Sequence, residues 1–137
     1  MERTVSTVGI LVSPLSAVAV AVPYLLLPTA ETPGLAQYYG FGLVTPWVAA
    51  IGGLVGAVAF AGGRAGNTDP ETVAGAVLAV GVVMTVIVVQ WALSVDVTVL
   101  QSITSVDWMA NHRWVVVGAT VPVPVVAAAY AWSLDLF

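Results

Sequence analysis

The stretch that decides the fold class runs from Val80 to Val89 and reads VGVVMTVIVV. Valine favours β-strands in soluble proteins, so a strand is the first alternative to weigh. Strands of a membrane barrel alternate apolar and polar residues, whereas this stretch is apolar on both faces. It also lies inside a continuous apolar window over residues 73–95, which is too long for a strand. The sequence therefore predicts a transmembrane helix here.

Composition extends this prediction to the whole chain. Of its 137 residues, 60% are hydrophobic and only 7% are charged, and the mean hydropathy is +1.03. Soluble domains carry about 25% charged residues. A chain of this length still leaves about a third of its unfolded surface exposed after folding, so a large buried core cannot explain the difference. We expect that exposed surface to face lipid.

Four windows meet the requirement of about 17–25 mostly apolar residues for a crossing of about 30 Å. They cover residues 8–27, 41–61, 73–95 and 114–132, and none contains Asp, Glu, Lys, Arg or His. The first is too long for the apolar core of a secretory signal peptide, about 7–15 residues, so we interpret it as a span. Short connections make consecutive helices antiparallel neighbours. The predicted fold is all-α, an integral membrane four-helix up-down bundle forming one domain over residues 1–137.

Three arginines and no lysine carry the orientation signal. With the amino terminus inside, Arg3 and Arg64 lie on the cytoplasmic side and Arg113 lies outside. The positive-inside rule therefore predicts a multi-pass protein of the cell membrane with cytoplasmic N- and C-termini.

Two connections have recognisable local signals. Thr68 and Glu71 have the spacing of a capping box, with Pro70 in the first turn of the third span. Between the third and fourth spans, the apolar residues of 99–110 fall on one helical face, which predicts a short amphipathic surface helix. A partly ordered loop is the alternative for that segment.

Small residues and prolines are expected to shape the bundle. Helices in lipid approach closely through small side chains spaced four apart, which predicts packing inside the bundle, or alternatively in a dimer, at Gly52, Gly56, Gly75 and Ala79. A proline inside a helix removes one hydrogen bond and leaves a carbonyl for a neighbour or water to satisfy. Kinks are predicted at Pro14, Pro23, Pro122 and Pro124.

The residues that usually carry chemistry are scarce. There is no cysteine and only one histidine, so thiol catalysis, thiolate metal sites and paired-histidine ligation are excluded. The predicted spans hold none of the charges that pumps and proton relays place within the membrane. We expect no catalytic role, no cofactor, no metal and no nucleic-acid partner.

One polar group of residues precedes the fourth span on the predicted outer side. It comprises Asp96, Asp107, Trp108, His112 and Arg113. Asp107 and Arg113 are placed to pair across the loop, and His112 near a carboxylate would titrate around neutral pH. Two interpretations remain open: an interfacial anchor that fixes the depth of the fourth helix, or an outer patch that contacts a partner, an ion or a headgroup.

Several short strings occur in the order seen in one known group of proteins. They are PYLLL at residues 23–27, YYG at 38–40, FAGGR at 60–64 followed by TDP at 68–70, WAL at 91–93 and HRW at 112–114. In these strings and in its lysine-free, acidic composition the chain resembles a haloarchaeal family of small four-helix integral membrane proteins of unassigned function. The resemblance implies the fold but no catalytic or binding residue.

Two functional hypotheses from different classes follow. The first is a non-catalytic accessory or structural subunit of a membrane assembly, bound to other membrane subunits or to copies of itself. The second is an oligomeric pore or carrier for a small solute or ion, lined by Ser, Thr and Gln side chains and by carbonyls that prolines leave free. The second requires those polar groups to share a face.

Overall fold

The computed structural model describes residues 2–136, and within that range the chain is helical with no strand. The elements in chain order are α1 (Glu2–Val12), α2 (Leu15–Leu26), the 3-10 helix η1 (Thr29–Gly34), α3 (Leu35–Tyr39), α4 (Trp47–Ala65), α5 (Pro70–Ser94), α6 (Val97–Ile103), α7 (Met109–Thr120) and α8 (Pro122–Ser133).

Four helical stretches in the described part of the chain are long and apolar enough to cross a membrane: Arg3–Leu26, Trp47–Ala65, Pro70–Ser94 and Met109–Ser133. The first combines α1 with α2, and the last combines α7 with α8. The prediction of an all-α chain with four apolar helices of spanning length is confirmed. This fits a multi-pass membrane protein.

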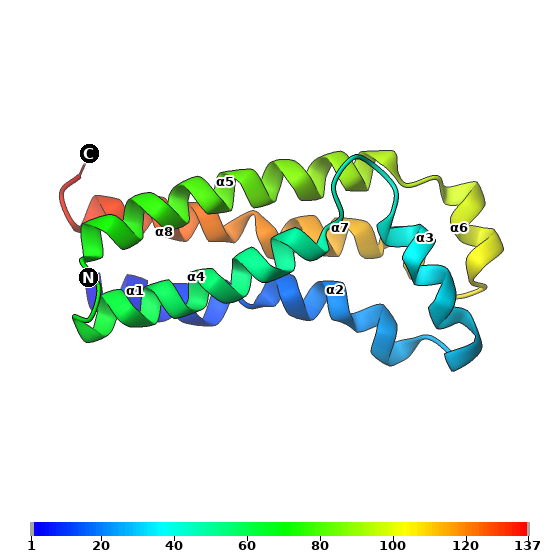
Figure 1. The fold of residues 1–137 in the computed structure, drawn as a ribbon, viewed down its shortest axis with the longest axis horizontal. Helices are drawn as coiled ribbons and strands as arrows, with labels where there is room; N and C mark the ends of the chain where they lie inside the picture. Colours follow the sequence, from blue (N-terminus) through cyan, green and yellow to red (C-terminus); the bar gives the residue numbers. More distant parts are fainter. Residues whose placement is uncertain (1, 137) are drawn as a thin grey trace.

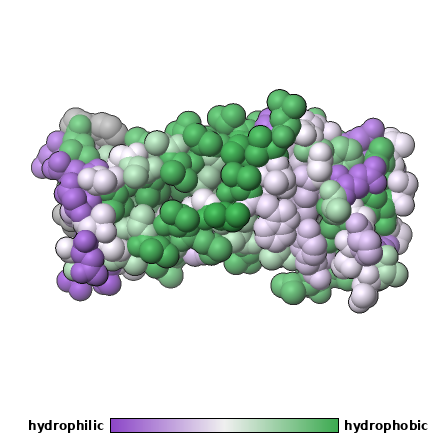
Figure 2. Space-filling model, viewed as in Figure 1, coloured by the Kyte–Doolittle hydropathy of each residue, from purple (hydrophilic) through white to green (hydrophobic). Residues whose placement is uncertain are grey.

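The long helices lie side by side, with short elements at one end (Figure 1). Helix α1 packs on α4 and α8, α5 packs on α4, α7 and α8, and α2 packs on α4 and α7. Both chain ends lie at one end of the molecule, called here the terminal end. The elements η1, α3 and α6 lie at the other, called the cap end. Hydrophilic residues gather toward both ends and a hydrophobic belt lies between them (Figure 2).

The second spanning helix begins later than the sequence predicts. Its window was predicted to open at Phe41, but the helix starts at Trp47, after a turn in which Gly42 has a φ of +81°. The side chain of Gln90 holds this turn, because its Oε1 accepts from the Leu43 N–H at 2.9 Å and its Nε2 donates to the Val44 carbonyl at 2.8 Å. These apolar residues therefore form a tethered loop.

The fourth spanning helix begins earlier than predicted, at Met109 instead of Trp114. Helix α7 therefore includes His112 and Arg113, which precede the predicted window, so the start predicted for the fourth helix is wrong. The His112 side chain is buried, with 4% of its surface exposed. A hydropathy average ends the predicted span before such residues, because it treats every polar side chain as if it faced lipid.

Prolines interrupt two of the spans. Helix α1 ends at Val12 and α2 begins at Leu15, with Pro14 between them, and α7 gives way to α8 at Val121, just before Pro122. Each of these prolines lacks the N–H that would continue the hydrogen-bond ladder. Pro23 and Pro124 instead lie inside α2 and α8, without a break in the helix.

Glycines set the closest helix contacts, although only some of those predicted. A Cβ on Gly52 would lie 2.8 Å from the Met84 Sδ, and one on Gly56 would lie 3.4 Å from the Ser13 Oγ, so both face neighbouring helices. Gly75 has open space at its Cβ position, and Ala79 is exposed. The prediction that Gly75 and Ala79 pack inside the bundle is therefore wrong, because spacing alone does not tell which face of α5 points inward.

The tightest contact on α5 lies at a different glycine. A Cβ on Gly81 would come within 2.8 Å of the Pro124 nitrogen and 3.0 Å of its Cα, which are backbone atoms of α8. On α4, a Cβ on Gly53 would collide with the Ser16 Oγ and the Ser13 carbonyl oxygen at the interruption between α1 and α2. At these two glycines the helix backbone therefore lies directly against backbone atoms or a hydroxyl of the neighbouring segment.

Two local predictions need correction. Helix α6 covers only Val97–Ile103, and Thr104 is extended, so the predicted amphipathic helix over 99–110 ends early. Asp96 caps α6 by accepting from the Thr98 N–H at 2.9 Å. Asp69, not Thr68, is the N-cap residue of α5, and its carboxylate accepts from the Thr72 hydroxyl at 3.0 Å, so no capping box forms.

Candidate functional site

The candidate site is a buried cluster at the cap end formed by Tyr38, Tyr39, Trp91 and His112, called here the aromatic cluster. None of these side chains exposes more than 4% of its surface. The tyrosines come from the short helix α3, Trp91 from α5 and His112 from α7. Helix α3 lies against the ends of the long helices because η1 reverses the chain after α2 (Figure 1).

His112 is hydrogen-bonded at both ring nitrogens. Its Nε2 lies 2.6 Å from the Ala19 carbonyl oxygen, and its Nδ1 lies 2.9 Å from the Tyr38 hydroxyl. A carbonyl oxygen can only accept, so Nε2 must carry the proton. In the neutral ring Nδ1 then accepts from the Tyr38 hydroxyl. For a neutral imidazole, the geometry thus selects the tautomer that is protonated at Nε2.

The free carbonyl at Ala19 has a cause in the sequence. In an α-helix this carbonyl would accept from the N–H four residues later, which is position 23. Pro23 has no N–H, so the carbonyl is left for another donor. His112 supplies that donor from α7. The sequence predicts that Pro23 leaves a carbonyl for a neighbouring group, and that group is His112.

Tyr38 connects three elements of the fold. Its hydroxyl donates to His112 on α7, and its carbonyl accepts from the Trp91 indole N–H of α5 at 3.0 Å. The Trp91 ring also packs edge-on against the Tyr38 ring, with centroids 5.2 Å apart. Burial raises the pKa of Tyr38 above its ordinary value, so the hydroxyl stays protonated near neutral pH and remains a donor.

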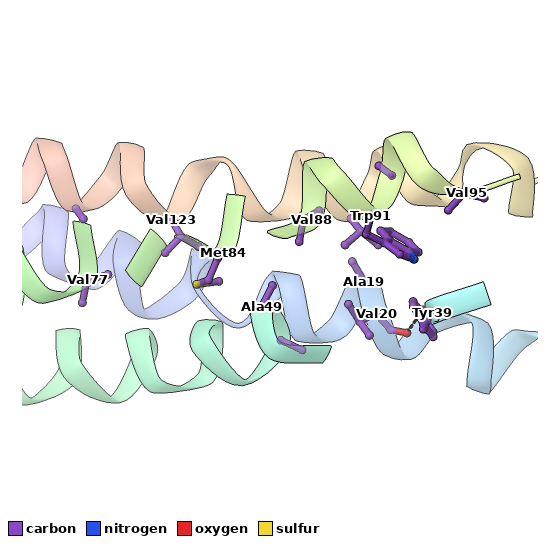
Figure 3. Close-up of a cluster of buried hydrophobic side chains, with 14 of the residues drawn as sticks. Ala19, Val20, Tyr39, Ala49, Val77, Met84, Val88, Trp91, Val95 and Val123 are labelled. Carbon is purple, nitrogen blue, oxygen red and sulfur yellow. Dashed lines mark hydrogen bonds between the residues drawn. The ribbon is translucent and has the colours of Figure 1, made fainter. Parts of the chain in front are cut away.

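Tyr39 joins the same cluster to α2. Its hydroxyl donates to the Val20 carbonyl, the contact drawn as a dashed line in Figure 3. Its ring stacks on Trp91 at a centroid distance of 5.5 Å and on Tyr24 at 5.9 Å. Burial, followed by the nearby Tyr38, raises the pKa of Tyr39 as well. Both tyrosines therefore hold α3 onto the bundle as neutral donors.

The structure does not bring the predicted outer patch together as one surface. Asp96 caps α6, and Asp107 is exposed and lines a separate groove of about 240 Å³ with residues of α6 and α7. Trp108 is partly exposed, with its ring centroid 6.0 Å from that of His112. His112 itself faces the interior, which corrects its expected place beside a carboxylate.

Arg113 does not form the expected pair with Asp107. Its guanidinium lies 5.4 Å from the ring centroid of Trp114, and its Nε and Nη1 have no hydrogen-bond partner. Elsewhere at the cap end, Glu31 of η1 accepts from the Thr104 hydroxyl at 3.1 Å and so ties η1 to the segment after α6. The anchoring or contacting role of the patch stays a prediction.

Sequence reasoning did not identify Tyr38, Tyr39 and Trp91 as partners of His112. Aromatic residues at the ends of apolar segments are typical of an interfacial belt, so their positions do not indicate a buried cluster. The one available signal was Pro23, which marks the Ala19 carbonyl as needing a donor. Among residues 2–136, no group of three His, Cys, Asp or Glu side chains lies close enough to hold a metal ion. The cluster is thus a hydrogen-bonded clasp between α2, α3, α5 and α7.

Comparison with known proteins assigns the chain to a family. No curated protein and no solved structure matches it. The model of a family of unknown function, DUF7548, matches residues 1–135, which is nearly the whole chain. The protein whose buried histidine clasp is described above therefore belongs to the DUF7548 family.

Proposed function

We propose that this protein is a non-catalytic, multi-pass integral membrane protein that serves as an accessory or structural subunit of a membrane assembly. Its four apolar helices would form an up-down bundle in the cell membrane, with both termini on the cytoplasmic side. The lysine-free, acidic composition supports a haloarchaeal source. Its partners would be other membrane subunits or further copies of this chain.

The observation that carries this proposal is how the polar side chains of the spans are used. The hydroxyls of Thr85 and Thr120 donate to carbonyls of their own helices, each at 2.8 Å, and the Ser16 hydroxyl donates to the Ser13 carbonyl just before α2, at 3.2 Å. His112 and Tyr38 satisfy each other. Few polar groups inside the bundle are left to bind or transform a substrate, so the remaining functional surface is the outside of the helices.

That outside includes an apolar groove between α4 and α5. It has a volume of about 420 Å³ and is lined by Val48, Ile51, Gly52, Val55, Ala79, Val80, Val83, Met84 and Ile87. Among them, Gly52 and Ala79 are the small residues that let another helix approach closely in lipid. We take this groove as the contact face for a neighbouring transmembrane helix.

The pore alternative has less support. Ser13, Ser16 and Thr120 are buried in contacts between helices, and Gln90 holds the loop before α4. Ser13 and Ser16 both lie against Gly53 of α4, so these residues serve helix packing. A pore would need a lining supplied by the outer faces of several copies, which are apolar.

The test is purification in mild detergent followed by native mass spectrometry and cross-linking. We expect a stoichiometric partner or a defined oligomer. Ile51→Trp, inside the groove, should dissociate it, whereas Val125→Trp on α8 should not. The two positions are 62% and 60% exposed, so the same bulky side chain is added to equally open sites. Recovery of the wild-type protein only as a monomer would refute the proposal.

A further inference from the structure

A second groove lies at the terminal end, between α1 and α4. It has a volume of about 350 Å³ and is lined by Arg3, Thr4, Thr7, Val8 and Arg64. Two of the three arginines of the protein therefore line one depression. Hydrophilic residues are concentrated at this end, beside the hydrophobic belt (Figure 2).

The packing of α1 on α4 brings these arginines together. Gly9 lies against the ring of Phe60, where an added Cβ would be 2.6 Å from the ring Cδ2. Such a close approach needs a glycine, and it holds the two helices near each other at this end. Arg64 follows Phe60 by one helical turn, and Arg3 precedes Gly9 by about one and a half turns. Both guanidinium groups reach the same groove from opposite helices.

No acidic side chain neutralises this pair among residues 3–136. Asp69, Glu71 and Asp135 belong to the same end, yet neither arginine forms an ion pair with them. The chain as a whole has a formal net charge of −4, so acids outnumber bases. Two guanidinium groups that have no carboxylate partner among residues 3–136 create a local site that favours an anion.

The groove continues into an apolar surface. Val8 lines it and is 41% exposed, and Leu11 and Leu15 lie three and seven residues further along, with 67% and 47% exposed. This spacing puts the three side chains on one face of the first span. A ligand that fits the whole surface has an anionic head at the arginines and a hydrocarbon tail along α1 and α2.

We propose that the Arg3–Arg64 groove binds the phosphate of an anionic glycerophospholipid, with one hydrocarbon chain lying along Val8 and Leu11. Guanidinium groups bind phosphate oxygens through paired hydrogen bonds, and basic grooves between transmembrane helices are suited to lipid headgroups. The Thr7 hydroxyl is not available, because it donates to the Arg3 carbonyl at 2.8 Å. The arginines therefore carry the recognition. This site goes beyond the proposed accessory role and does not depend on it.

The experiment is a lipid titration of the delipidated full-length protein, read by native mass spectrometry. The probes are phosphatidylglycerol, phosphatidylcholine and inorganic phosphate. Arg3→Gln and Arg64→Gln should each weaken phosphatidylglycerol binding about tenfold, the loss expected for a charge-assisted contact. Arg113→Gln removes the same charge at the cap end and should change binding by less than about twofold. Phosphatidylcholine and inorganic phosphate should bind more weakly than phosphatidylglycerol to the wild-type protein.

Several results would overturn the proposal. Equal loss in all three variants would mean a general charge effect, and no loss in Arg3→Gln or Arg64→Gln would mean that the groove is not the site. Inorganic phosphate binding as tightly as phosphatidylglycerol would identify a soluble anion as the ligand. Thermal unfolding followed by circular dichroism checks that each variant is folded. Arg64→Lys, which keeps the charge, should restore part of the lipid affinity and serves as a second folded variant.

Discussion

Adding one methyl group at Gly81 tests whether the close crossing of α5 and α8 is as tight as the structure has it. The Cβ of Gly81→Ala would meet the nitrogen and Cα of Pro124 at 2.8 and 3.0 Å. Both are backbone atoms in the interior of a helix, so neither can rotate away as a side chain would. The two helices must separate or slide, and overpacking of this kind costs about 1–3 kcal/mol.

Gly75→Ala is the matched control. It lies on the same helix, receives the same methyl group and has open space at that position. Alanine is favoured over glycine within a helix by up to about 1 kcal/mol, and this gain is common to both variants. Comparing the two therefore removes the helix-propensity term. What remains is the contact with Pro124.

The assay is reversible unfolding in mixed detergent micelles by SDS titration, followed by circular dichroism. Gly81→Ala should be less stable than Gly75→Ala by about 1–3 kcal/mol, or about 5- to 150-fold in the unfolding equilibrium. A difference below about 0.5 kcal/mol would refute the reasoning, because it would mean that α8 yields freely at this crossing. Equal destabilisation of both variants would also contradict it, since Gly75 contacts no neighbouring helix.

Three further predictions concern the cap end. Tyr38→Phe should lower the free energy of unfolding by about 1–3 kcal/mol in the same SDS titration, because the buried His112 Nδ1 loses its donor. Tyr24→Phe, at a residue that is 40% exposed, should change it by less than about 0.5 kcal/mol. Because the pKa values of Tyr38 and Tyr39 are raised in the folded protein, the unfolded chain loses these protons first as the pH rises, so stability should be constant near neutral pH and fall above about pH 10. In thermal melts at alkaline pH, the double variant Tyr38→Phe and Tyr39→Phe should lose stability less steeply. Gln90→Leu should speed hydrogen exchange at the Leu43 amide by about tenfold or more, whereas Gln101→Leu should leave the exchange rate of that amide unchanged. If the Leu43 amide stays protected in Gln90→Leu, the loop does not depend on the Gln90 side chain.

The apolar helices could be predicted from sequence because hydropathy over about twenty residues is a local property. Their ends could not. Phe41 and its neighbours are apolar enough to continue a span, but the loop they form depends on Gln90, which lies in another helix. At the fourth span, His112 was excluded because its type is polar, and its burial depends on partners 74 and 93 residues away.

Small residues show the same limit. Gly52, Gly75 and Gly81 are the same residue type, and each lies in a long apolar helix. Gly52 nevertheless lies against Met84, Gly75 faces open space, and Gly81 lies against the backbone of α8. Spacing four apart identifies a face of a helix. It does not say which neighbour that face meets, because that depends on how the other helices pack.

The link between Pro23 and His112 shows where sequence reasoning can reach further. A proline inside a transmembrane helix leaves the carbonyl four residues earlier without its usual donor, and in lipid water cannot easily replace it. The position of the carbonyl without its usual donor, Ala19, follows from the sequence alone. The donor must then come from a neighbouring helix at similar depth, and the chain has one histidine to offer. An apparently misplaced histidine at the start of the fourth span and a proline late in the first span are therefore two halves of one contact, and this explains why α7 can begin at Met109 and carry His112 into the bundle.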